Sequence, residues 1–349
     1  MMSFRDDKIE KISYNLPVVN LLNRINEYKG KQELYKHQSP ELLDALLQVA
    51  KIQSVESSNR IEGIFAEDKR ISLLVKEKVE PRNRDEAEIA GYRDCLELIH
   101  ASATHMPIKP HIIQQVHRTM MALSTGTGGN WKSVDNFIRE TLPSGEQVVR
   151  FIPVPAWKTQ DAMEELCQLY LEKKDKGQVP SLVLDALFVL DFLSVHPFSD
   201  GNGRMARLLT LWVLYLGGFE VGRYISLEKL VEQLKEQYYK TLQQSSQGWH
   251  DGEHDVAPWL EYYLTIVLRA YQKFDEHVGT ISTRSRGWKK KKIESVVDSF
   301  IADFTIADLL DRCPGIARPT VTRTLSQLSQ QGVIECVELG RNARWRKLK

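Results

Sequence analysis

The stretch that decides the fold is SVHPFSDGNGRMAR, residues 194–207, which separates two apolar runs with a helical pattern. The first run, from residue 181, ends at His196-Pro197-Phe198, and the second begins after Asp200-Gly201-Asn202-Gly203 and continues to residue 216. Pro197 disfavours helical geometry at His196, and the two glycines allow positive φ and a close approach of the backbone to a ligand. The sequence therefore predicts two helices joined by a tight loop that is open to a ligand.

A glycine-rich turn that runs directly into a helix predicts an anion-binding site. It directs unsatisfied backbone N–H groups and the positive end of the helix dipole at whatever lies above it, and diphosphate oxygens fit that description. Asn202 can add a side-chain amide. Arg204 and Arg207, three positions apart on one helix face, can hold phosphates from the side.

The same loop carries a candidate metal ligand and a candidate base. Asp200 offers the hard oxygen donors that Mg²⁺ takes together with substrate phosphates. His196 lies just ahead of the phosphate site, where a neutral imidazole could take a proton from an incoming hydroxyl. The alternatives are a structural histidine and an ordinary turn. The presence of an acid, cations and a base within twelve residues favours a catalytic site.

The composition bounds the class of protein. A length of 349 residues predicts two or three domains, and 42% hydrophobic with 27% charged residues excludes a disordered or fibrous chain. The four cysteines are far apart with no CxxC pair, which argues against a zinc knuckle and a disulfide framework. The first residues are charged without an apolar segment, and no apolar run is long enough to cross a bilayer. We therefore expect a cytoplasmic protein with no membrane partner.

Apolar residues recur three and four positions apart through most of the chain before residue 280, which predicts a mainly α fold. The exception is residues 136–153, where two short β-prone runs flank turn-forming residues and predict one hairpin. The expected organisation is a helical N-terminal region over 1–100, a helical core over 101–278, a linker over 279–289 and a C-terminal domain over 290–349.

The C-terminal domain carries the excess of basic charge. Residues 280–349 contain 14 Lys/Arg and 7 Asp/Glu, a formal charge of +7, whereas the rest of the chain is −6. The predicted order is helix (292–302), helix (306–312), turn, helix (319–331) and two short strands, which resembles a winged helix-turn-helix. Such domains bind DNA or proteins, and both partners stay open. The residues expected to contact DNA are Arg318, Thr320, Thr322, Arg323, Arg341 and Arg344.

The motif from His196 to Arg207 resembles the signature HPFx[DE]GNGRxxR of the Fic (Fido) family at every fixed position. The resemblance implies an all-α core that uses ATP and Mg²⁺ to move AMP onto a Ser, Thr or Tyr hydroxyl of a protein, with release of pyrophosphate. It implies His196 as general base and Asp200 as magnesium ligand. The implied ATP and phosphate ligands are Ser199, Gly201, Asn202, Gly203, Arg204, Arg207, Tyr238 and Tyr239. Core aromatics are the alternative for the two tyrosines.

A second family pattern lies upstream. Residues 58–63, from Ser58 to Glu62-Gly63, fit the inhibitory-helix pattern [ST]xxxE[GN], in a helix expected around 50–63. The resemblance implies that Glu62 pairs with Arg207, so that ATP binds in a pose unfit for in-line attack. The alternative is a helix that ends at Gly63 with a surface glutamate.

Three other segments complete the comparison with the family. The hairpin around 136–150 lies where the family has the flap that aligns a target segment, and a structural hairpin is the alternative. The family often has Gly-x-[FY]-Arg before the flap, whereas Gly129-Asn130-Trp131-Lys132 leaves the role of Lys132 open. Residues 250–254 match the HxxEH pattern of zinc proteases, but Gly252 in a polar turn predicts a loop.

The leading hypothesis is an autoinhibited adenylyltransferase that modifies a protein hydroxyl, its own included. One alternative is AMP removal, or transfer of another phosphate-containing group, at the same site. Another is a DNA-binding regulator whose helical body senses nucleotide. The expected partners are ATP, a target protein docked on 136–150, DNA, and a second copy of the chain in a homodimer.

Overall fold

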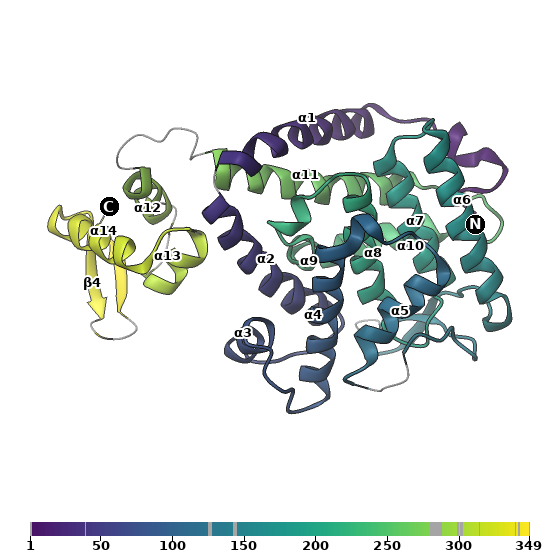
Figure 1. The fold of residues 1–349 in the computed structure, drawn as a ribbon, viewed down its shortest axis with the longest axis horizontal. Coiled ribbons are helices and arrows are strands. Elements are labelled where there is room, and N and C mark those ends of the chain that lie inside the picture. The colour runs from purple at the N-terminus through teal and green to yellow at the C-terminus, as the bar shows by residue number, and fades with distance from the viewer. Residues whose placement is uncertain are drawn as a thin grey trace. The chain divides into compact units, whose positions relative to one another are not determined.

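The structure is a computed structural model that describes residues 2–38, 40–124, 128–141, 145–279, 288–298, 300, 303–313, 315–338, 340 and 343–348. These residues form two compact units, Met1–Gly30 with Ala50–Tyr271 and Lys31–Val49 with Gln272–Lys349. The prediction of a mainly α fold with one hairpin is confirmed (Figure 1). Among the described helices, none combines the length and apolar character that a bilayer crossing requires.

The chain up to residue 279 is a succession of helices interrupted once by the hairpin. Short 3₁₀ helices lie at Arg5–Lys11, Ala103–His105, Ala156–Lys158 and Val221–Arg223. The α-helices and strands are α1 (Leu16–Gln38), α2 (Pro40–Ile61), α3 (Asp68–Lys76), α4 (Arg84–Ser102), α5 (Pro110–Met121), β1 (Ile138–Thr141), β2 (Gln147–Phe151), α6 (Thr159–Lys176), α7 (Ser181–Val195), α8 (Asn202–Leu216), α9 (Leu227–Gln233), α10 (Lys235–Ser246) and α11 (Ala257–Gly279).

Helices α7 and α8 form the centre of the larger unit, and Figure 1 shows α8 surrounded by other helices. Every residue of α7 from Leu182 to Val195 is buried, because the helix is mostly apolar, packs against both α6 and α8, and has hydrogen-bond partners for Asp185 and Asp191. Most of α8 is buried as well. The loop between these two helices is therefore held at both ends by buried helices of the core.

The predicted hairpin consists of β1 and β2 in antiparallel pairing. Ile138 pairs with Phe151 and Arg139 with Val149, with a bulge between these two pairs. The tip of the predicted turn, residues 142–144, lies outside the described residues. Most side chains of β2 are exposed, so the hairpin extends from the helical body with much of its surface accessible.

The smaller unit contains α12 (Trp288–Asp298), β3 (Phe304–Thr305), α13 (Ile306–Arg312), α14 (Arg318–Gln330), β4 (Ile334–Glu338) and β5 (Arg344–Lys347). The strands form one sheet in the order β3-β5-β4, so the structure has one strand more than predicted. The first helix begins four residues earlier than the predicted 292, because the lysine run 289–292 favours helix. A capping box between Thr305 and Asp308 fixes the start of α13 as predicted.

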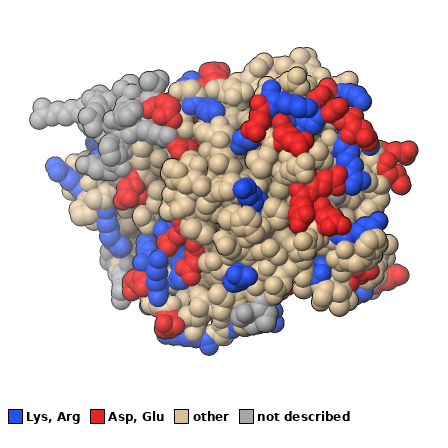
Figure 2. Space-filling model, turned by 45° about the vertical axis from the view of Figure 1, so that its right-hand side comes forward, with Lys and Arg blue, Asp and Glu red and all other residues tan. Residues whose placement is uncertain are grey.

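Charged side chains of both signs are interspersed on the face that Figure 2 shows. Ion pairs among the described residues join Arg5 to Glu165, both partly exposed, and Lys51 to Glu97, whose side chains are half-buried. Ion pairs near the surface contribute little stability each.

Candidate active site

The loop between α7 and α8 is shaped by two residues in the left-handed region. His196 ends α7 with φ +50° and ψ 59°, and Gly201 precedes α8 with φ +77°. A Cβ atom at Gly201 would lie 2.7 Å from the Met120 Cε atom and would force that side chain to shift, and the positive φ itself disfavours a residue other than glycine. The predicted arrangement of helix, tight loop and helix is confirmed at this position.

Asn202 closes the loop on itself. Its Oδ1 accepts a hydrogen bond from the Phe198 backbone N–H at 2.9 Å, and its Nδ2 donates to the Phe198 carbonyl at 2.7 Å. The side-chain amide is therefore not directed at a ligand, contrary to the sequence expectation, because the loop's own backbone groups need these partners. The backbone N–H of Asn202 still belongs to the first turn of α8, where amides have no partner within the helix.

A cleft of about 880 Å³ opens above this loop, within the usual range for small-molecule sites. It is bounded by the end of α2, the hairpin, α7, α8 and α10. The sequence-predicted residues that line it are Glu62, His196, Ser199, Asp200, Gly201, Asn202, Gly203, Arg207, Tyr238 and Tyr239. Segments far apart in the sequence thus contribute to one site.

His196 has the protonation state that a base requires. Burial lowers the pKa of its imidazole to about 4, so the ring is neutral at pH 7. Its Nδ1 lies 3.3 Å from the Leu193 carbonyl oxygen, which can only accept a hydrogen bond, so the proton is assigned to Nδ1. This tautomer leaves the lone pair on Nε2, and His196 lines the cleft. His196 is therefore prepared to accept a proton there.

Asp200 presents a carboxylate to the cleft. Its side chain is 58% exposed, and its Oδ1 accepts a hydrogen bond from the Gly201 N–H at 2.6 Å. No cluster of three or more His, Cys, Asp or Glu side chains suited to a metal occurs in the described part of the chain. A single exposed carboxylate fits Mg²⁺ if substrate phosphates and water supply the remaining oxygens, as this ion prefers.

Arg207 is buried and paired with α2. Its Nη2 donates to Glu62 Oε1 at 2.7 Å and to the Ser58 carbonyl at 2.9 Å, and its Nε donates to Ser58 Oγ at 2.8 Å. Burial by itself would lower the pKa of Arg207, but the Glu62 carboxylate together with Tyr238 and Tyr92 more than offsets burial, so the pKa is raised. The predicted pairing of Glu62 with Arg207 is thus present in the structure.

Gly203 allows Glu62 to approach the loop. A Cβ atom at Gly203 would lie 2.3 Å from Glu62 Oε1, so any side chain here would displace the carboxylate. Gly203 therefore serves two purposes, because the same absence of a side chain opens the backbone N–H to a phosphate. The Glu62 carboxylate occupies the space that a side chain at Gly203 would take.

The end of α2 places Glu62 by a Schellman-type turn. The Ile64 N–H donates to the Asn59 carbonyl and the Gly63 N–H to the Arg60 carbonyl, with Gly63 at φ +81°. The helix therefore ends at Ile61, and the same turn at Gly63 that ends it also places Glu62 in its ion pair with Arg207.

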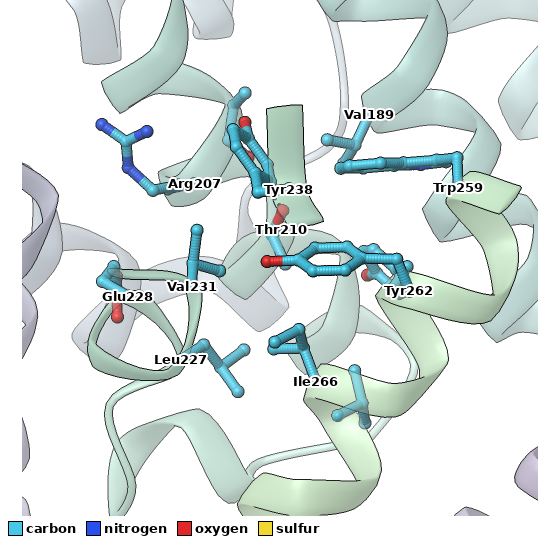
Figure 3. Close-up of a pocket in the computed structure, with 13 residues that line it drawn as sticks. Val189, Arg207, Thr210, Leu227, Glu228, Val231, Tyr238, Trp259, Tyr262 and Ile266 are labelled. Atoms are coloured by element: carbon cyan, nitrogen blue, oxygen red, sulfur yellow. Dashed lines mark hydrogen bonds between the residues drawn. The ribbon is translucent and has the colours of Figure 1, made fainter. Parts of the chain in front are cut away.

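A small cavity adjoins Arg207 and Tyr238, two residues that also line the cleft (Figure 3). Its walls are mostly apolar and include Val231, Trp259 and Ile266. Figure 3 shows the guanidinium turned away from Trp259 and Tyr262. Because apolar surroundings strengthen charge interactions, Arg207 depends on partners from the cleft side, which at present are Ser58 and Glu62.

Arg204 does not line the cleft, which corrects the expectation that it holds phosphates. Its side chain is buried, with Nη1 2.8 Å from Glu88 Oε2, and Nη2 lies 4.0 Å from Asp200 Oδ1. The i, i+3 spacing puts Arg204 and Arg207 near each other, but the turn of the helix directs Arg204 toward α4. Arg204 therefore connects the start of α8 to α4 instead of contacting a ligand in the cleft.

The two tyrosines combine both predicted alternatives. Tyr238 is buried beside Trp259 and Tyr262, whereas Tyr239 is 46% exposed, and both line the cleft. Burial raises the pKa of each phenol. Tyr239 is thus accessible to a ligand, while Tyr238 belongs to the core and to the cleft wall together.

Two supporting residues were not identified from the sequence as parts of the site. The His117 ring stacks on Phe198 at 3.7 Å, accepts from the Gly129 N–H at Nδ1 and lies 3.1 Å from the Asp200 carbonyl at Nε2. Since Nδ1 accepts, Nε2 carries the proton and donates to Asp200. Asn136 bonds the loop carbonyls from the start of the hairpin region. The only sequence signal for His117 is its place on the apolar face of α5.

The HxxEH segment is not helical. Residues 247–252 form turns, Gly252 has φ +70°, and His250 Nε2 lies 2.7 Å from the Ile152 carbonyl oxygen. The predicted loop is confirmed. A zinc site of the protease type needs the two histidines on one face of a helix, which this segment does not provide.

The candidate DNA-binding residues are mostly exposed. Arg318, Thr322 and Arg323 are exposed on α14, and Thr320 is half-buried there. Arg344 is exposed on β5 opposite Glu338. Arg341 lies outside the described residues.

Residues 107–214 match a family model described as the Fic/DOC family. A protein of Nematostella vectensis named "Protein adenylyltransferase Fic" is 23% identical over 73% of this chain and 55% of its own length. A Fido domain-containing protein of Dictyostelium discoideum is 30% identical over 27% of this chain and 61% of its own length. The chain thus spans little more than half of each relative. A Fic family protein from Desulfovibrio desulfuricans G20 has the same fold, with a TM-score of 0.63 at 20% identity over 97% of both chains.

Proposed function

We propose that this chain, whose residues 107–214 match the Fic/DOC family model, is an autoinhibited protein adenylyltransferase. It moves AMP from ATP to a Ser, Thr or Tyr hydroxyl of a protein, its own surface included. The target docks beside the hairpin at 136–150. AMP removal or transfer of another phosphate-containing group would use the same residues and is the nearest alternative.

The observation that carries the proposal is the ion pair of Glu62 with Arg207 at 2.7 Å, in the same cleft as a neutral His196. Arg207 is the one predicted phosphate-binding arginine that lines this cleft in the described residues. While Glu62 holds it, the guanidinium cannot form a bidentate contact with a phosphate. Arg207 therefore determines both repression, through its ion pair with Glu62, and the capacity for transfer, through its contact with phosphate.

In the proposed reaction, the target hydroxyl oxygen attacks the α-phosphorus of ATP. The bond from that phosphorus to the bridging oxygen of pyrophosphate breaks, and Nε2 of His196 accepts the hydroxyl proton. The amides at the start of α8 and the Arg207 guanidinium neutralise the phosphates. His196 and the amides are fixed by α7 and α8, so little reorganisation is needed during the step.

Asp200 would hold Mg²⁺ in this scheme. When bound, the ion would neutralise charge that develops on the leaving pyrophosphate. The exposure of the Asp200 carboxylate and its place in the cleft fit this role. The loop keeps the carboxylate oriented through the Gly201 N–H.

The test compares purified wild type, Glu62→Gly and Glu62→Gly with His196→Ala, each incubated with Mg²⁺ and ATP and measured by intact mass. We expect an AMP adduct on Glu62→Gly, at least roughly tenfold more than on wild type if the ion pair contributes about 1.5 kcal/mol to the resting state. Glu62→Gln is the matched control, because it removes the charge and keeps the shape.

The double variant with His196→Ala should carry no adduct. An adduct of equal size on wild type and Glu62→Gly would contradict the autoinhibition. An adduct that survives His196→Ala would contradict the assigned base. No adduct on any variant, even with cell extract as a source of targets, would contradict the transferase.

DNA binding by α14 is a second candidate function. The helix contains no Asp or Glu, and it exposes Arg318, Thr322 and Arg323 on one side. A helix that follows α13 across a short turn, with exposed cations at its start, suits phosphate contacts and the major groove.

The test is fluorescence anisotropy with duplex DNA at two salt concentrations. The double variant Arg318→Gln/Arg323→Gln should bind more weakly, with the slope of log K against log salt smaller by roughly two. Arg24→Gln, an exposed arginine on α1, is the control. Equal binding by wild type and the double variant would refute this assignment.

A further inference from the structure

Lys132 bonds the backbone on both sides of His196. Its Nζ donates to the Val195 carbonyl at 3.1 Å, and its backbone N–H donates to the Pro197 carbonyl at 2.8 Å. Lys132 is 3% exposed, although lysine is rarely buried. The Val195 carbonyl is the last of α7, where a cation compensates the negative end of the helix dipole.

Asn136 bonds the two remaining carbonyls of the turn. Its Nδ2 lies 3.3 Å from the His196 carbonyl oxygen and 3.0 Å from that of Phe198. Its Oδ1 accepts from Lys132 Nζ at 2.8 Å, which fixes the orientation of the amide. Four successive carbonyls, from Val195 to Phe198, are therefore all bonded by this pair of residues.

The turn needs such support because of the conformation at its centre. His196 has φ +50°, which a residue other than glycine adopts at a cost and keeps only where its surroundings over-determine it. The peptide groups on either side of His196 set the direction of its Cα–Cβ bond. Fixing their carbonyls fixes the direction from which the imidazole enters the cleft.

We propose that Lys132 and Asn136 are positioning residues that hold His196 in its strained backbone conformation, with Nε2 directed at the target hydroxyl. The proposal rests on the proposed transfer at His196. Neither residue lines the cleft, so neither is assigned a contact with nucleotide or target. The positive charge of the buried Lys132 ammonium also lowers the pKa of the His196 imidazole, which favours the neutral form that a base requires.

The main experiment uses the full chain in the Glu62→Gly background, with AMP incorporation measured against ATP concentration. Lys132→Met removes the bonds of Nζ and keeps the length of the chain, and Lys132→Arg keeps a cation with several donors. Lys174→Met is the matched control, because Lys174 is also partly buried with a lowered pKa but bonds to Tyr170 on α6.

We expect Lys132→Met to lose roughly a hundredfold in maximal rate, as small displacements of a catalytic group do, with the half-saturating ATP concentration within about twofold. Lys132→Arg should recover most of the rate, and Lys174→Met should retain it. A rate for Lys132→Met within about threefold of its parent would overturn the proposal. An equal loss of rate and ATP affinity would also overturn it, because it would indicate a nucleotide ligand.

A second measurement does not depend on transfer. Nitrogen-15 NMR of the histidine rings, with the His196 signals identified by their loss in His196→Ala, reports the tautomer. We expect a single Nδ1–H tautomer in wild type and Lys174→Met, and averaged shifts in Lys132→Met, each measured well below the melting temperature of the variant. Identical His196 shifts in all three proteins would overturn the proposal even if activity differed. Absence of AMP transfer in the Glu62→Gly parent would refute the proposed function alone, since the NMR result stands without it.

Discussion

At the residue scale, burial and hydrogen bonding decide which members of the motif face a ligand. His196, Asp200 and Arg207 line one cleft, as the order of the motif predicts. Asn202 and Arg204 turn inward, because the Phe198 backbone and the Glu88 carboxylate hold them. Sequence spacing indicates that two side chains share a helix face, but it does not indicate where the partner from α4 lies.

Lys132 illustrates the same limit. In the sequence it is a departure from the family's Arg and has no assignable partner. Besides Asn136 Oδ1, its partners are the backbone carbonyls of Val195 and Pro197, which no side-chain pattern encodes. These partners become apparent only in the structure, where the segment that precedes the hairpin packs against the loop.

The lowered pKa of His196 predicts a particular pH profile for transfer. An imidazole with a pKa of about 4 is in its basic form above that pH, so activity should not depend on this group between about pH 6 and 8. The groups whose charges act on the ring are Lys132, Glu62 and Asp200. The measurement is the maximal rate of Glu62→Gly from about pH 4.5 to 8. A maximal rate that increases with pH around 6.5 would indicate a histidine with an ordinary pKa and would contradict the assignment of His196, with its lowered pKa, as the base.

At the element scale, α2 is attached to α9 as well as to Arg207. Ser57 Oγ donates to Glu232 at 2.8 Å, and Ser54 Oγ donates to Glu228 at 2.7 Å. At the last residue of α2, Lys235 Nζ from α10 donates to the Ile61 carbonyl at 2.8 Å. These bonds recur one helical turn apart, so they fix the rotation of α2 and with it the direction of Glu62.

This attachment predicts that α2 can be loosened without touching the cleft. Ser57→Ala removes a bond to a charged acceptor worth about 1.5–3 kcal/mol, and Ser57 does not line the cleft. We expect basal AMP incorporation to rise several-fold, but less than in Glu62→Gly. In the Glu62→Gly background the same change should add nothing, because the ion pair is already absent. Additive effects in this double-mutant comparison would mean that Ser57 acts by another route.

At the scale of the whole molecule, the chain divides less simply than its composition predicts. The charge and periodicity shift near residue 280 indicates a separate C-terminal domain, and the structure has a compact unit there. That unit also contains residues 31–49, and Leu42 lies against Gly315. Local sequence patterns predict helices and linkers. They do not predict the association of residues 31–49 with the C-terminal residues, because these segments are distant in sequence. The division into four segments at 100, 278 and 289 therefore remains a proposal.

Buried neutral histidines predict acid sensitivity of the fold. Burial lowers the pKa of His117 to about 4 and that of His100 to about 3, below the unfolded value of about 6.5. Between these values the unfolded chain binds more protons, so stability is complete above about pH 6.5 and falls as the pH drops toward 4. Asp185 opposes this, since burial raises its pKa to about 7 and its contribution is lost as the pH rises.

The prediction is sharpest for His117, which bonds Gly129 and Asp200 and stacks on Phe198. His117 accounts for about 2 kcal/mol of the free energy of unfolding that is lost between pH 7 and 5, because its ring stays neutral in the folded state while the same residue takes up a proton in the unfolded chain. In urea unfolding at both pH values, His117→Gln should be less stable than wild type at pH 7 and closer to it at pH 5. The exposed His105→Gln should follow wild type throughout. A difference between His117→Gln and wild type that stays constant with pH would show that His117 contributes through packing alone.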